Sequence, residues 1–326
     1  MRIILKYLRK FIWLNHPGYE FYSLHLVLDK IKNSKEKSAL MSLYEIKKVC
    51  KGLPKIYYLQ ISGEESFSRQ DLSNICKSFI EINSTKFITI STDGEEPEKV
   101  AKITKDLVKN KCLFGIGVRT DKIFNSGKNN SDKNLQKALA TYKRLQSIAK
   151  NNKNLKIKFS SIMTKGNANS LKDLHKLLKS SFPLSYHVVI PDICPKNTPT
   201  AAQYIHNIKK IKLKKGLLSK SRYNFVHFLL GGNGWPFDCI AGKNIGVIYS
   251  NGNVKLCEMH KPIGNLKDYG YSFYRIWNSD KAAKQRELIK YRKCTKGCTN
   301  PVMLEASIIK NPLNILKIIR LKKSFP

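Results

Sequence analysis

Two kinds of hydrophobic pattern alternate along residues 20–215. Short, continuous apolar runs are typical of strands buried on both faces of a parallel sheet. Between them lie segments whose apolar residues recur every three or four positions, as in amphipathic helices. The expected strands are Phe21–Leu28, Lys55–Ser62, Lys86–Ile90, Cys112–Val118, Lys156–Met163 and Tyr186–Ile190. The expected helices are Leu43–Val49, Asp71–Ile82, Pro97–Lys109, Asp132–Lys150 and Ser170–Leu178.

Repeated strand–helix units of this length predict a parallel sheet with right-handed crossovers and helices on its outer face. Six units are fewer than the eight of a closed barrel. The expected fold class is therefore α/β, with a partial (β/α)6 TIM-like barrel. We assign the barrel to residues 21–230 and a basic N-terminal segment to residues 1–20.

The pattern changes near residue 230. The lysine-dense stretch Ile205–Arg222 predicts a surface helix and linker, and Gly231–Gly234 is interpreted as an interdomain turn. Beyond it, Asn251-Gly252 predicts the turn of a β-hairpin, and a helix is expected over about Ser279–Tyr291. Residues 231–326 are thus expected to form a small, cysteine-rich α+β domain with a basic C-terminal tail.

The chain of 326 residues is strongly basic, with 60 Lys and Arg against 23 Asp and Glu and a net charge of +37. Such a balance predicts non-specific, salt-dependent binding to polyanions. Ten of the basic residues are arginines, whereas phosphate recognition favours the arginine fork. The amino-acid usage of an AT-rich genome is the simpler explanation. A nucleic-acid-binding protein with a C-terminal zinc module remains an alternative.

The apolar content of 42% is enough for a large core, so extensive disorder is excluded. No apolar run reaches the roughly 18 residues of a membrane-spanning helix. The opening Met1–Leu14 is interrupted by basic residues and lacks a cleavage site. A cytoplasmic location without disulfides is therefore expected.

Eight cysteines fall into two groups. Cys50, Cys76, Cys112 and Cys194 are scattered and are interpreted as small buried hydrophobes. Cys239, Cys257, Cys294 and Cys298 lie within sixty residues of one another and are the candidate metal ligands. Four thiolates from a hairpin and a loop suit either Zn²⁺ or a [4Fe–4S] cluster, and their spacing alone does not separate the two.

Five short motifs surround these cysteines. They are Cys239-Ile-Ala-Gly, Gly252-Asn-Val-Lys-Leu-Cys257-Glu258, Ile263-Gly-Asn-Leu, Ile276-Trp-Asn-Ser and Cys294-Thr-Lys-Gly-Cys298. With them, the stretch from Cys239 to about Ile315 resembles the auxiliary-cluster domain of radical SAM proteins, of the SPASM or shorter twitch type. The resemblance implies one [4Fe–4S] cluster on the four cysteines and makes zinc the less favoured metal.

The N-terminal region also resembles this family. Ser62-Gly-Glu-Glu-Ser66 stands where the family has a GGEP-type motif, Thr92-Asp93-Gly94 where a TNG-type turn is common, and Asp121 at an SLDG-type strand end. The resemblance implies that Ser62, Gly63 and Glu65 are the positions that would contact S-adenosylmethionine. It also implies a peptide or protein substrate, or a catalytic partner protein.

The sequence differs from the radical SAM pattern at several positions that matter for catalysis. Radical SAM enzymes hold their catalytic cluster through a CxxxCxxC motif after the first strand, but this chain has no cysteine before Cys50. The region Gly18–His25 offers Gly, Tyr and His instead, and His25 is interpreted as an ordinary strand-end histidine. Glu64 adds bulk and charge at the cofactor turn, and Arg119 and Lys122 replace small residues.

We therefore expect a member that keeps one auxiliary cluster but has lost the catalytic one, acting as a non-catalytic or partner-dependent protein. Whether it is an enzyme is left open. The alternative is an active radical SAM enzyme, modifying a peptide, sugar or cofactor, whose N-terminal region is damaged or misannotated. Nucleophilic catalysis has little support, because there is no G-x-S-x-G elbow. His187 and His227 are interpreted as packed residues and His260 as a surface residue.

Overall fold

The computed structural model describes residues 21–28, 40–120, 127–182, 187–191, 196–210, 217–235, 238–290 and 298–300, together with 303, 306–307 and 313–314 in the C-terminal tail. Among the helices in these ranges, none is long and apolar enough to cross a membrane. Cys194, Cys294, Asp121, Lys122 and the expected segment 1–20 lie outside the described residues.

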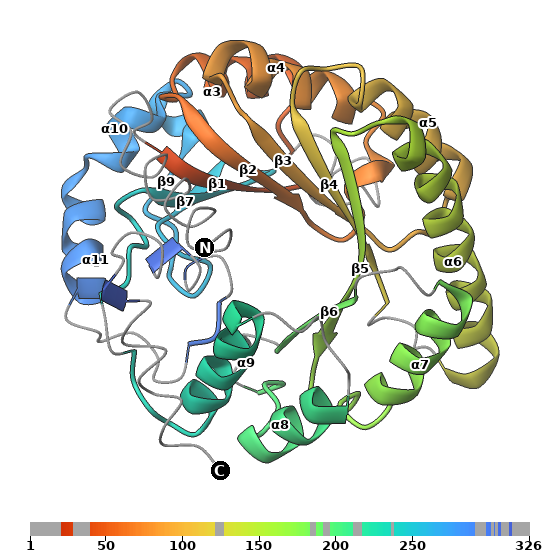
Figure 1. The fold of residues 1–326 in the computed structure, drawn as a ribbon. Coiled ribbons are helices and arrows are strands. Elements are labelled where there is room, and N and C mark those ends of the chain that lie inside the picture. The colour runs from red at the N-terminus through yellow and green to blue at the C-terminus, as the bar shows by residue number, and fades with distance from the viewer. Residues whose placement is uncertain are drawn as a thin grey trace.

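A single nine-stranded sheet organises the molecule, in the order β6-β5-β4-β3-β2-β1-β7-β8-β9. Its first six strands along the chain pair in parallel. They are β1 (Phe21–Val27), β2 (Ile56–Ser62), β3 (Phe87–Thr92), β4 (Leu113–Arg119), β5 (Leu155–Met163) and β6 (His187–Pro191). Figure 1 shows this sheet curving inside an arc of helices. The expected fold class, a six-stranded partial barrel with parallel strands, is confirmed.

Helices join successive strands and cover the outer face of the curved sheet (Figure 1). They are α3 (Leu43–Lys51), α4 (Leu72–Asn83), α5 (Pro97–Leu107), α6 (Gly127–Asn151) and α7 (Leu171–Ser181), followed by α8 (Ala201–Lys210) and α9 (Leu217–Leu230). The core lies between the two layers. For example, the Tyr142 ring of α6 stacks on Phe159 of β5 with ring centroids 3.8 Å apart.

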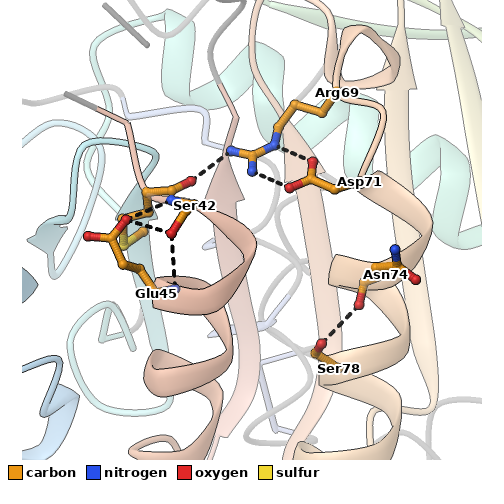
Figure 2. A network of polar contacts seen from close by, with 7 residues as sticks. Ser42, Glu45, Arg69, Asp71, Asn74 and Ser78 are labelled. Carbon is orange, nitrogen blue, oxygen red and sulfur yellow. Dashed lines mark hydrogen bonds and ion pairs between the residues drawn. The ribbon is translucent and has the colours of Figure 1, made fainter. Parts of the chain in front are cut away.

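The starts of α3 and α4 are tied together by a buried arginine (Figure 2). Asp71 stands at the start of α4 as expected, but its carboxylate does not cap the helix and instead accepts two bonds from Arg69, at 2.8 and 2.7 Å. Arg69 also donates to the Met41 carbonyl oxygen, at 3.1 Å. Ser42 and Glu45 form a reciprocal capping box at the start of α3, which satisfies N–H groups that a helix leaves unpaired.

The cysteine-rich segment joins the same sheet. The expected hairpin is present as β7 (Ile245–Tyr249) and β8 (Asn253–Lys255), followed by β9 (Gly264–Asn265). Strand β7 pairs in parallel with β1, with Leu24 opposite Gly246. The short helices α10 (Phe273–Trp277) and α11 (Asp280–Lys290) follow. The division of the chain at about residue 230 stays a prediction.

Candidate functional site

The predicted cofactor residues Ser62, Gly63 and Glu65 lie at the carboxyl end of β2. At the end of β2, Gly63 has φ +148°, and a Cβ built on it would lie 1.8 Å from the Leu28 carbonyl oxygen. The Leu28 N–H in turn donates to the Ser62 carbonyl oxygen at 2.6 Å. Glycine is required at this position because the backbone after β1 passes directly against it.

Glu65 connects the ends of β2 and β3. Its carboxylate accepts bonds from the N–H groups of Phe67, at 3.0 Å, and Asp93, at 2.8 Å, and from the Thr92 hydroxyl, at 2.9 Å. Burial raises the pKa of this carboxyl, against the opposing effect of these donors. The neighbouring Glu64 is exposed. Glu65 therefore holds two strand ends together, a role that its predicted contact with a cofactor did not include.

A charged pair lies beside this turn. The Arg119 Nε atom is 3.5 Å from Asp93 Oδ1, and both side chains are largely buried. Arg119 also donates from Nη1 to the Gly63 carbonyl oxygen at 3.4 Å. The arginine that departs from the family pattern is thus positioned by the strand ends around the glycine turn.

A buried row of polar side chains connects the barrel to the cysteine-rich segment. His25 of β1 contacts the Ser62 hydroxyl through Nε2, at 2.5 Å, and Glu258 Oε1 through Nδ1, at 2.7 Å. Asn300 donates to the second oxygen of Glu258 at 3.1 Å. Burial raises the pKa of Glu258, but His25, Asn300 and Lys255 outweigh it and the net shift is downward.

The sequence pattern did not indicate this row, because His25 has the position of an ordinary strand-end residue. The region equivalent to the cluster motif was expected at Gly18–His25. Strand β1 occupies Phe21–Val27, so that placement was wrong, and the segment that follows the first strand is Leu28–Leu40. This segment contains no cysteine either.

Three of the four candidate ligands fall within the described residues. Burial raises the pKa of the Cys257 thiol to about 12, with smaller contributions in the same direction from the nearby Cys298 and Cys239 thiols. Cys239 Sγ accepts a bond from the Ala241 N–H at 3.5 Å, and the Cys298 carbonyl accepts one from Trp235 at 2.7 Å. The thiols of Cys239 and Cys298 are therefore near enough to Cys257 to affect its pKa, whereas Cys294 lies outside the described residues.

The surroundings of these thiols fit an iron–sulfur cluster. Next to Cys298, the buried Thr299 hydroxyl has no hydrogen-bond partner within the described ranges, and it could donate to a sulfide or thiolate. No three Cys, His, Asp or Glu side chains in those ranges are grouped to hold one metal ion. In a four-iron cluster each thiolate binds a separate iron. The lack of a single-ion site in these ranges is therefore compatible with a four-iron cluster.

Other predicted residues lie in the packed interior. Cys50, Cys76 and Cys112 are buried, as expected. His187 is buried on β6, where its Nε2 lies 2.8 Å from the Ser161 hydroxyl and its Nδ1 lies 3.4 Å from Nδ1 of His175. His227 and His260 are both half-buried, so the surface location predicted for His260 is only partly correct.

Comparison with known proteins identifies the cysteine-rich segment. Residues 239–299 match the family model SPASM, an iron–sulfur cluster-binding domain. The cysteine-rich segment is thus a SPASM-type domain, and it follows an α/β fold with a parallel sheet. The SPASM match includes all four grouped cysteines as well as β7, β8, β9, α10 and α11. No curated protein sequence matches the chain.

The fold is similar to that of solved structures of anSMEcpe. The structure of anSMEcpe with bound AdoMet and Kp18Cys peptide has a TM-score of 0.53 and 12% identity, covering 93% of this chain and 100% of that chain. With bound AdoMet and Cp18Cys peptide the TM-score is 0.52, also at 12% identity, with 93% and 99% covered. Streptococcus suis SuiB has a TM-score of 0.48 and 13% identity, with 86% and 70% covered.

Proposed function

We propose that this SPASM protein binds one [4Fe–4S] cluster through Cys239, Cys257, Cys294 and Cys298 and does not itself cleave S-adenosylmethionine. The match of residues 239–299 to an iron–sulfur cluster-binding domain carries the first part. The effect of the Cys239 and Cys298 thiols on the pKa of Cys257 supports the ligand set. A bound cluster supplies a redox centre and a covalent connection between the hairpin and the segment after α11.

The second part of the proposal rests on the segment after β1. In radical SAM enzymes this segment carries the three thiolates of the catalytic cluster, but Leu28–Leu40 contains none. Because β1 itself is present and paired with β2, an altered region before the strand would not supply them. This argues against the alternative of an active enzyme with a damaged N-terminal region.

A peptide or protein is the substrate class, or the partner class, that we propose for the open end of the barrel. Two structures with the same fold contain a peptide and AdoMet. Ser62 and Gly63 remain the positions that would approach S-adenosylmethionine if it binds, whereas Glu65 is committed to the ends of β2 and β3.

Anaerobic reconstitution with iron and sulfide tests the cluster. The wild-type chain is expected to hold about four iron atoms and to turn brown. Cys257→Ala should lose most of this iron and destabilise the C-terminal segment, because metal-binding energy is partly folding energy. Cys76→Ala is the matched control, because Cys76 is buried in α4 away from the grouped thiols. Unchanged iron in Cys257→Ala, or a colourless zinc protein, would overturn the proposal.

The same reconstituted sample tests the lack of S-adenosylmethionine cleavage. With a strong reductant, it should form no 5′-deoxyadenosine above a control without protein. Cluster-dependent 5′-deoxyadenosine formation would show that other residues, or a partner, supply the missing ligands.

A further inference from the structure

Three side chains from distant parts of the chain form a row that the family resemblance does not account for. The Ser62 hydroxyl lies 2.5 Å from Nε2 of His25, and Nδ1 of the same ring lies 2.7 Å from Glu258 Oε1. A hydroxyl, an imidazole and a carboxylate in this order are the parts of an activated serine nucleophile, which is recognised by geometry and not by sequence order.

The contacts of the imidazole select the tautomer that such a site needs. Because Glu258 faces Nδ1, the ring proton belongs on that nitrogen, and the Nε2 lone pair then points at the Ser62 hydroxyl. Asn300 fixes the other oxygen of Glu258 at 3.1 Å. His25 is only 7% exposed, so its ring is held in one orientation.

The position of the row in the fold also fits catalysis. Ser62 is the last residue of β2 and remains partly exposed, whereas the histidine behind it is buried. In barrels of parallel strands, reactive side chains lie at the carboxyl ends of the strands. The guanidinium of Arg119 lies 3.4 Å from the carbonyl oxygen of Gly63, the next residue. A cation held at the residue after Ser62 could stabilise a negatively charged oxygen during acyl transfer.

We propose that Ser62 is a nucleophile for carboxylic esters or thioesters, with His25 as general base and Glu258 as the residue that positions the imidazole. Ser62 Oγ forms a bond to the acyl carbon while its proton passes to His25 Nε2. The bond to the leaving alcohol or thiol then breaks, and His25 returns the proton to that group. Water attacks the acyl-serine in the same way, which releases the acid and restores the serine hydroxyl. No metal takes part in these bond changes.

A fluorophosphonate probe tests the proposal directly, because it forms a stable bond with activated serine hydroxyls. The full-length protein is incubated with the probe, and the adduct is located by peptide mass spectrometry. One adduct per chain is expected, on Ser62. Because mass spectrometry locates the adduct in the wild-type protein, the result does not depend on the folding of a variant. An unlabelled Ser62 in the folded protein would overturn the proposal.

Three variants separate catalysis from a purely structural contact. Ser62→Ala should abolish labelling, while Ser68→Ala, in the same loop but outside the row, should label at the wild-type rate. Glu258→Gln keeps the size of the side chain but favours the wrong imidazole tautomer, so labelling should slow by about 100-fold or more. A Glu258→Gln protein that folds and labels at the wild-type rate would show that the row only joins two parts of the fold.

Discussion

Adjacent glutamates at the end of β2 differ sharply in their surroundings. Glu65 is buried and accepts three hydrogen bonds, whereas Glu64 is exposed. From the sequence, both belonged to a degenerate cofactor motif, and nothing in their order indicated which one is structural. The difference arises from the turn at Gly63, which directs one side chain inward towards Thr92 and Asp93.

Glu65→Ala is therefore expected to lower the free energy of unfolding by about 2–3 kcal/mol, since it leaves buried donors on Thr92 and Asp93 without an acceptor. Urea unfolding followed by circular dichroism measures this loss. The matched variant Glu64→Ala removes an exposed carboxylate and should change the free energy by less than about 0.5 kcal/mol. Equal losses in the two variants would contradict the assigned role.

Prediction at single positions depends on whether the signal is local in the sequence or arises from the pairing of distant strands. The four grouped cysteines were visible because they are close in sequence and chemically distinctive. The contact of His25 with Ser62 and Glu258 was not visible, because it depends on two pairings of β1. Strand β2 brings Ser62 beside Val27, and β7 brings the hairpin that precedes Glu258 to the opposite edge. No local pattern in the sequence encodes those two registers together.

At the level of elements, sequence periodicity predicted all six barrel strands and the helices between them. The starts of two helices, α6 and α4, differ from the expected ones in position or in capping. Helix α6 begins at Gly127, before the expected Asp132. The first residues are polar and include weak helix formers, so the sequence pattern did not indicate this early start. Asp71 begins α4 without capping it, because its carboxylate binds Arg69.

The packing of α7 against β6 depends on two uncharged histidines. Burial lowers the pKa of His187 to about 3, with smaller contributions in the same direction from the nearby His175 and Lys179. Burial also lowers the pKa of His175. Between pH 6.5 and about 3, the unfolded chain binds a proton at residue 187 that the folded chain does not. The free energy of unfolding should therefore fall as the pH falls through this window and should level off below it.

For His187 alone, the loss between pH 7 and pH 5 is expected to be about 2 kcal/mol. Urea unfolding at the two pH values measures it in the wild type and in His187→Gln, which can still bond to Ser161 but cannot titrate. The variant should show a weaker pH dependence by about that amount. The same pH dependence in both proteins would mean that other groups control acid stability.

On the scale of the whole molecule, the net charge of +37 dominates interactions at a distance. Binding to duplex DNA of arbitrary sequence should weaken by about 1,000-fold between 50 and 200 mM salt, because counterion release drives such binding. Fluorescence anisotropy with two unrelated duplexes measures this, and uncharged dextran serves as the control polymer. A sequence preference that survives at 200 mM salt would instead favour the nucleic-acid-binding alternative.

The pairing of β7 with β1 has a consequence for how the chain is made. One edge of β1 pairs with β2, which follows about 30 residues later in the chain. The opposite edge pairs with β7 (Ile245–Tyr249), which is synthesised much later. At roughly 5–20 residues per second, a ribosome needs roughly 10–40 s to reach that strand. During this time a strand containing Leu24 and Leu26 presents unpaired backbone groups, which can pair with other nascent chains. The final closure of the sheet is therefore a late event, and the nascent chain should depend on chaperones until it is complete.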